Sequence, residues 1–117
     1  MTHDVDFYIS RGFDRPMAEY MVAGRCRAVS AAPLGASSVL VSFDDGESRS
    51  YDLSGLMGPG TVFSFLADPK ALARVYVDED GSVCWDRDPD VDSREAWSNK
   101  VDISADDIYV YGETLVK

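Results

Sequence analysis

Two aspartate–glycine turns, each between runs of alternating residues, constrain the fold of this 117-residue chain more than any other feature. The first turn, residues 44–47, separates the runs 38–43 and 48–53. An aspartate–glycine pair between alternating runs is the strongest short-range signal for a β-hairpin. The sequence therefore predicts an antiparallel hairpin here, with three apolar residues on its buried face: Val39, Val41 and Phe43.

The second turn, residues 78–81, predicts another hairpin between residues 74–77 and 82–85. Four apolar residues would share its buried face: Val75, Val77, Val83 and Trp85. A further strand is expected over residues 26–31, ended by Pro33 and Gly35. These strands indicate a mainly antiparallel sheet built from two β-hairpins.

Capping residues predict short helices around these strands. Residues 5–24 have the pattern of two helices, in which Gly12 ends the first and Gly24 ends the second. Asp14 is the expected N-cap of the second helix. Further caps are expected at Asp68, followed by Pro69, and at Ser104, which would open a helical turn carrying Ile108 and Tyr109.

The fold class that follows is α+β: an N-terminal helical pair, then a mainly antiparallel sheet of two hairpins with short helices. We expect a helical extension over residues 1–26, an α+β domain over 27–111 that forms one globular unit with it, and a tail over 112–117. The chain has no apolar run of the ~20 residues needed to cross a membrane. Residues 1–6 lack the basic and apolar segments of a signal peptide, so a cytoplasmic location is expected.

Cysteine and histidine usage argues against an enzyme or a zinc site. His3 is the single histidine, at a terminus, so a serine or cysteine nucleophile would lack a well-placed base. Cys26 and Cys84 allow one disulfide by count, but in the cytosol both are expected to be buried, reduced thiols. The sequence therefore predicts no catalytic, cofactor-binding or metal-binding residue.

The formal charge of −10 is concentrated in the second half of the chain. Eight of the 21 acidic and five of the 11 basic residues precede residue 61, so that half carries −3 and the rest −7. Nucleic-acid affinity comes from lysine and arginine that neutralise phosphates, so direct nucleic-acid binding is not the first expectation. An acidic domain suits a basic protein partner instead.

The densest acidic segment alternates aspartates over residues 86–92, namely Asp86, Asp88, Asp90 and Asp92. It departs from a calcium loop at Val91, where glycine is required, and at Trp97, where a glutamate belongs. We therefore predict no metal site. These four aspartates and Trp97 are instead the candidate partner-binding residues, while the sequence leaves open whether Trp97, Tyr109 and Tyr111 belong to the core or to an interface.

Two alternatives remain at this point. A DNA-binding or transcription-regulatory accessory role would require four arginines to line one exposed helix face: Arg11, Arg15, Arg25 and Arg27. A small-ligand-binding role would require a deep pocket with buried carboxylates.

An ordered series of segments resembles the bacterial domain of unknown function 2442 over about residues 27–111. The resemblance rests on a series of segments: Val29 with Pro33-Leu34, Val41-Ser42-Phe43-Asp44-Asp45-Gly46-Glu47, Tyr51-Asp52-Leu53-Ser54-Gly55-Leu56, Phe63-Ser64-Phe65-Leu66-Ala67-Asp68-Pro69, Val75-Tyr76-Val77-Asp78, Gly81-Ser82-Val83-Cys84-Trp85, and Asp102-Ile103 with Asp106 and Tyr109. The shortest members lack both the N-terminal helical pair and the segment 86–100.

Some members of this family are described as antitoxins of toxin–antitoxin pairs, and others are fused to a DNA-binding helix-turn-helix. The resemblance therefore implies a non-enzymatic protein-binding module with an antitoxin role. The charge of −10 adds the expectation that the partner is basic. The partner's identity stays open. So does the oligomeric state, including whether an exposed strand edge pairs two copies into a homodimer.

Overall fold

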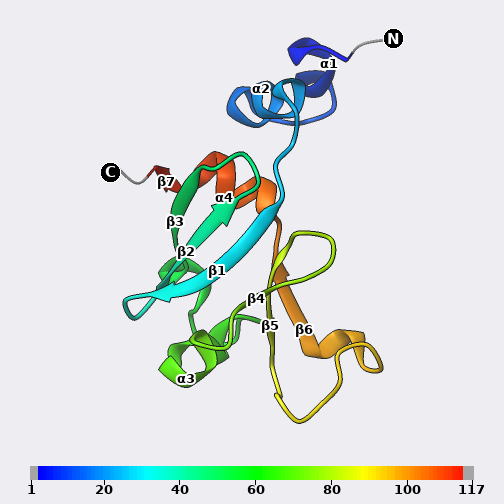
Figure 1. Cartoon of the computed structure of the whole chain (residues 1–117). Coiled ribbons are helices and arrows are strands. Elements are labelled where there is room, and N and C mark those ends of the chain that lie inside the picture. The colour runs from blue at the N-terminus through cyan, green and yellow to red at the C-terminus, as the bar shows by residue number, and fades with distance from the viewer. Residues whose placement is uncertain (1–2, 115–117) are drawn as a thin grey trace.

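The computed structural model describes residues 3–114 and contains two antiparallel sheets (Figure 1). The first has the strand order β1-β2-β3-β7, with β1 at Ala28–Leu34, β2 at Ser38–Phe43, β3 at Ser48–Asp52 and β7 at Glu113–Thr114. The second has the order β4-β5-β6, with β4 at Tyr76–Val77, β5 at Val83–Asp86 and β6 at Lys100–Ile103. Both predicted hairpins are confirmed, as β2–β3 and β4–β5, but they lie in separate sheets.

Short helices connect and cover the strands. The α-helices are α1 (Val5–Ser10), α2 (Arg15–Ala23), α3 (Pro69–Leu72) and α4 (Ala105–Tyr111), and the 3₁₀ turns are η1 (Ser54–Leu56), η2 (Ser64–Ala67) and η3 (Trp97–Asn99). The predicted caps are confirmed: Asp14, Asp68 and Ser104 each accept a backbone N–H in the first turn of α2, α3 and α4. The α+β class predicted from the sequence is therefore confirmed.

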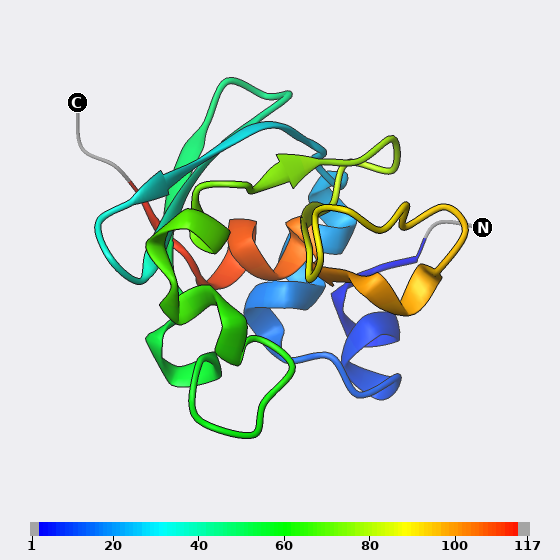
Figure 2. The same ribbon diagram turned by 90° about the horizontal axis from the view of Figure 1, so that it is seen from below.

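One hydrophobic core joins the two sheets. Val39 and Val41 of β2, Trp85 of β5 and Ile108 of α4 are all fully buried in it. Figure 2 shows α4 near the centre of the molecule, with strands and helices around it. The Trp85 indole donates a hydrogen bond to the Leu72 carbonyl at 3.3 Å, so the largest core side chain also fixes α3.

The structure corrects two local predictions. Strand β1 does not end before Pro33 but runs to Leu34, and Pro33 pairs with Val39 of β2. The proline is tolerated because β1 is an edge strand, whose outer side needs no donor. Cys84 is buried as expected, whereas Cys26 is only half-buried, and neither thiol is in a disulfide.

The N-terminal helices stand at one end of the molecule, beyond the sheets (Figure 1). Helix α2 contacts α4, and the chain then runs into β1. The Cα radius of gyration is 15.2 Å, against about 13 Å for a compact domain of this length. Within residues 3–114, no helix has the length and apolar character needed to span a bilayer.

Candidate functional site

Four of the five predicted partner-binding residues lie on the connection between β5 and β6, hereafter the β5–β6 loop (residues 87–99), and the fifth, Asp86, is the last residue of β5. Its two ends are held together because Asp86 of β5 pairs with Lys100 of β6 across the sheet. The same two strands continue inward through Trp85 and Val101, which are buried. The loop is therefore anchored on the core-facing part of the second sheet.

A single buried amide organises the interior of this loop. The Asn99 side chain is 8% exposed, and its oxygen accepts the Asp88 backbone N–H at 2.9 Å. Its nitrogen donates to the carbonyls of Asp88 and Val91, at 3.0 and 3.2 Å, and to the Ser93 hydroxyl at 3.1 Å. Asn99 thus supplies backbone partners in the middle of the loop, where no sheet or helix can supply them.

Asp86 fixes the base of the loop. Its carboxylate accepts hydrogen bonds from the Tyr76 hydroxyl at 2.8 Å and the Ser93 hydroxyl at 2.6 Å. Burial raises the pKa of the Tyr76 hydroxyl, and its hydrogen bond to Asp86 raises it further. Asp86 is therefore a structural acceptor, and its charge is already engaged within the fold.

The other three aspartates differ in how much of their charge is engaged. Asp88 accepts the Asp90 N–H at 2.9 Å, and Asp92 pairs with Arg94 at 3.0 Å. Hydrogen bonds from the Arg94 side chain and amide lower the pKa of the exposed Asp92 carboxyl. No group in residues 3–114 hydrogen-bonds the Asp90 carboxylate, so Asp90 presents the least neutralised charge. In the same described part of the chain, no cluster of three metal-ligating side chains forms.

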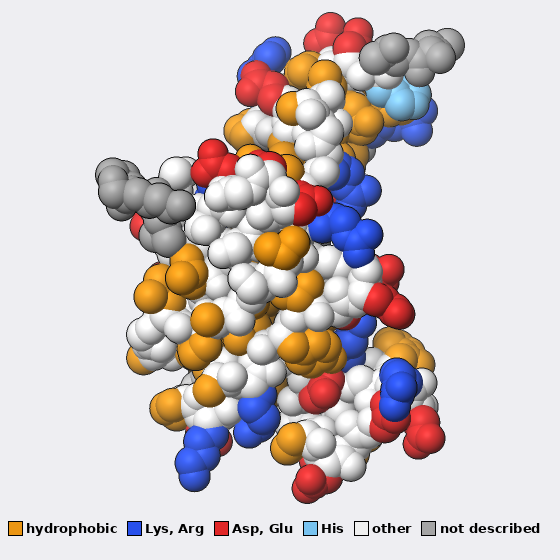
Figure 3. Space-filling view, in the orientation of Figure 1, with side chains coloured by type: hydrophobic (Ala, Val, Ile, Leu, Met, Phe, Trp, Pro, Cys, Tyr) orange, Lys and Arg blue, Asp and Glu red, His pale blue; other side chains and the backbone are white. Residues whose placement is uncertain are grey.

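Trp97 opens the turn η3 and is the most exposed large apolar side chain in the described part of the chain, at 84%. Val62, from a distant loop, is 54% exposed and lines the same surface hollow of about 380 Å³. Figure 3 shows acidic and basic side chains over this lobe, with hydrophobic atoms exposed among them. Of the three aromatic residues that the sequence left open, Trp97 is thus on the surface.

The other two aromatic residues have different environments. Tyr109 is half-buried against the core, where its ring packs edge-on to Phe43, and its hydroxyl donates to Asp45 at 2.6 Å. That hydrogen bond, followed by burial, raises the pKa of Tyr109 to about 12. Tyr111 is 49% exposed and donates to Asp14 at the start of α2.

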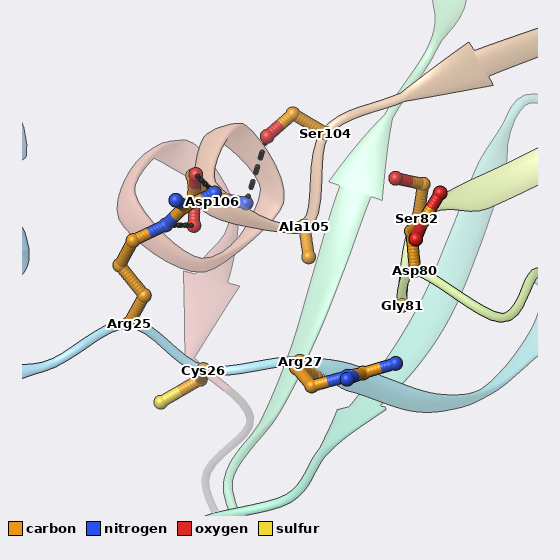
Figure 4. Close-up of a pocket in the computed structure, with 9 residues that line it drawn as sticks. All are labelled: Arg25, Cys26, Arg27, Asp80, Gly81, Ser82, Ser104, Ala105 and Asp106. Carbon is orange, nitrogen blue, oxygen red and sulfur yellow. Dashed lines mark hydrogen bonds and ion pairs between the residues drawn. The ribbon is translucent and has the colours of Figure 1, made fainter.

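A second polar cluster joins the N-terminal helices to the body, at a shallow hollow of about 310 Å³ (Figure 4). The Asp106 carboxylate, 7% exposed, accepts from the Tyr20 hydroxyl at 2.7 Å and from Arg25 at 2.7 Å. The Tyr20 hydroxyl in turn accepts the Cys26 N–H at 2.8 Å. Burial, followed by the hydrogen bond to Asp106, raises the pKa of Tyr20.

The four arginines of the DNA-binding alternative do not line one helix face. Arg15 lies in α2 and pairs with Glu19, while Arg11 caps α1 and lies over the Phe7 ring. Arg25 and Arg27 lie in the extended link before β1, and they bind Asp106 and the Glu79 carbonyl. The geometry that this alternative requires is therefore not formed.

Sequence reasoning missed the residues that hold these two sites together, Asn99, Tyr20 and Asp106. Tyr20 and Asp106 are 86 residues apart, and nothing local in the sequence links them. Nothing local indicated Asn99 either, because its side chain bonds the backbone of Asp88 and Val91, eleven and eight residues earlier.

Taken together, the fold and its surface define a small α+β domain that presents a tryptophan on a preorganised polar loop. The chain belongs to the family described as Protein of unknown function (DUF2442), whose sequence model matches residues 28–114. No curated protein and no solved structure matches the chain. The match begins at the first residue of β1, so α1 and α2 lie outside it, whereas the β5–β6 loop lies within it.

Proposed function

We propose that this chain is a non-enzymatic protein-binding module of the bacterial cytoplasm, and specifically the antitoxin of a toxin–antitoxin pair that binds a basic partner. One observation carries the proposal: Trp97 is 84% exposed on a loop whose backbone is already fixed by Asn99. Exposing an indole to water is unfavourable, and tryptophan is among the residues that most often dominate binding energy at protein interfaces.

The order of the loop strengthens this interpretation. A segment that must be ordered on binding loses conformational entropy, which reduces affinity. Here the hydrogen bonds of Asn99 and Asp86 have already ordered the backbone around Trp97. The exposed indole is therefore held in position before any partner arrives.

Charge supports a basic partner. Residues 61–117 carry 13 acidic and six basic side chains, and Asp88, Asp90 and Asp92 lie within ten residues of Trp97. A potential of one sign over an interface accelerates the encounter with a partner of opposite sign and makes the association salt-dependent.

The test is coexpression with each basic protein encoded beside this gene, followed by copurification at low and high salt. We expect one neighbour to form a stable complex and its toxicity to be relieved by this chain. Trp97→Ala should weaken the complex at least tenfold. Val29→Ala is the matched control, because Val29 is 58% exposed on β1 of the other sheet, and it should leave the affinity unchanged.

Two results would overturn the proposal. One is the absence of a complex with any basic neighbour at low salt. The other is a complex that neither salt nor Trp97→Ala weakens, because that complex would use a different surface.

A further inference from the structure

Three hollows adjoin one another along the β5–β6 loop. The first, of about 570 Å³, lies between Tyr76 and the segment 89–94. The second, of about 320 Å³, shares Ser93 with the first. The third, of about 380 Å³, shares Trp97, Lys100 and Asp102 with the second. We name this row of neighbouring hollows the Trp97 groove, because Trp97 lines two of the three.

The two ends of the Trp97 groove differ in chemistry. The first hollow is lined by Asp86, Asp90 and Asp92, with Arg94 as its one basic side chain, and Arg94 is already paired with Asp92. The third hollow is lined by four apolar residues: Val62, Phe63, Trp97 and Val101. Ser98 and three charged residues, Arg87, Lys100 and Asp102, also line it, and Lys100 is already paired with Asp78 at 2.6 Å. The groove therefore has an acidic end and an end where apolar side chains lie beside charged ones.

We propose that the Trp97 groove binds an extended segment of the partner, which places an arginine at the acidic end and an apolar side chain against Trp97 and Val62. Separate hollows for successive side chains are the usual means by which a protein reads an extended peptide, whereas a folded partner meets a flatter surface. This inference rests on the proposed function and specifies how the partner is recognised.

Asp90 is the specific anchor for the arginine. Its carboxylate has no hydrogen-bond partner within residues 3–114, whereas Asp86 and Asp92 are satisfied internally. A carboxylate accepts a guanidinium through two parallel hydrogen bonds, which favours arginine over lysine. The partner's arginine thus meets an acceptor that the fold has left unused.

The experiment is a titration of the full chain with acetylated, amidated peptides in which one to four glycines separate Arg from Leu. Two further series carry Glu in place of Arg, or Gly in place of Leu. Tryptophan fluorescence reports binding, because Trp85 is fully buried and Trp97 is 84% exposed. The Trp97→Phe variant is the control that gives the signal of Trp85 alone.

We expect one Arg–Leu spacing to bind at least tenfold more tightly than its Glu or Gly counterpart. Asp90→Asn should weaken this peptide about tenfold. Asp80→Asn is the matched control, since Asp80 is an exposed acid on the β4–β5 turn outside the groove, and it should have no effect.

The inference is overturned if no spacing is preferred, or if Asp80→Asn weakens the peptide as much as Asp90→Asn. It is also overturned if a second copy of this chain fills the groove, which sedimentation would detect as a dimer sensitive to Trp97→Phe. Failure of the two proposals is distinguishable. If a coexpressed basic partner forms a complex that depends on Trp97 but not on Asp90, the proposed function stands. Only the inference that the partner places an arginine against Asp90 is then wrong.

Discussion

The N-terminal arm, residues 5–27, and the β5–β6 loop each depend on a buried polar side chain, but the two side chains play different roles. Asp106 holds the arm through a charged pair with Arg25 and a bond from Tyr20. Asn99 holds the loop through neutral bonds to its own backbone. The arm is therefore attached through long-range partners, whereas the loop is ordered from within and leaves Trp97 exposed to solvent.

The two regions also differ in what they bury. Helix α2 turns Met17, Ala18 and Tyr20 inward, whereas α1 has no buried residue. The arm also leaves three large apolar side chains about 40% exposed: Ile9, Phe13 and Val22. The loop instead buries its polar residue Asn99 and exposes its largest apolar one. The 84% exposure of Trp97, about twice that of any apolar side chain on the arm, is the reason we propose the loop as the interaction site.

The largest expected effect on stability comes from removing the side chain that orders the β5–β6 loop. Asn99→Ala removes four hydrogen bonds of about 1 kcal/mol each, and rehydration of the loop backbone recovers part of them, so unfolding should become easier by about 3 kcal/mol. Urea denaturation measures this change. Hydrogen exchange should show lost protection at the Asp88 amide, whereas Ser98→Ala, at an exposed neighbouring position, should change neither quantity.

The next largest effect comes from disrupting the junction between the N-terminal arm and α4. Asp106→Asn keeps the shape of the side chain but removes the charge that Arg25 and Tyr20 contact, and should lower the free energy of unfolding by about 2 kcal/mol. Asp107→Asn is the control, because Asp107 occupies the same first turn of α4 but is exposed. Equal losses in the two variants would mean that the helix N-terminus, and not the junction, accounts for the effect.

A smaller effect compares the tyrosine at the base of the loop with the tyrosine at the junction of the arm. Tyr76→Phe removes one hydrogen bond to Asp86, which still accepts from Ser93, so about 1 kcal/mol should be lost. The expected loss for Tyr20→Phe is larger, because that hydroxyl also accepts the Cys26 N–H. Denaturation of both variants in parallel measures the order, and the reverse order would contradict this assignment of partners.

The last effect, absent at neutral pH, is a pH dependence shared by both regions. Folding raises the pKa of Tyr20 and Tyr76 above the ordinary value of 10.0, by burial and by their carboxylate partners. Their contribution is therefore complete below about pH 10 and is lost as pH rises toward the folded pKa. Each phenylalanine variant should reduce the alkaline fall in stability by up to about 1.4 kcal/mol per pH unit, as denaturation between pH 9 and 11 would show.

Local chemistry made the hairpins and caps predictable. Asp45-Gly46 and Asp80-Gly81 specify their turns within four residues, and both glycines adopt a positive φ. The division into two sheets was not predictable, since it depends on β6 pairing with β5 across a 13-residue loop. Strand β6 has four residues, Lys100–Ile103, and an alternation of polar and apolar residues this short does not identify a strand or its partner.

The candidate site was predictable only in part. The aspartates and Trp97 stood out by composition within one short segment, which forms the end of β5 and the β5–β6 loop. The aspartates differ in role because they have different hydrogen-bond partners. The Tyr76 hydroxyl donates to the Asp86 carboxylate, and the buried Asn99 oxygen accepts the Asp88 backbone N–H. Burial at such positions is a tertiary property, which a pattern of residue types does not encode.

The proline at position 33 has a consequence for how this chain behaves at high concentration. Strand β1 forms an outer edge of its sheet and exposes Val29 and Leu34, which is the composition of a strand that recruits other chains into aggregates. Pro33 has no N–H to offer to an incoming strand, so it interrupts such growth. Pro33 thus disfavours edge-to-edge aggregation of this chain during synthesis and storage, whatever the protein binds.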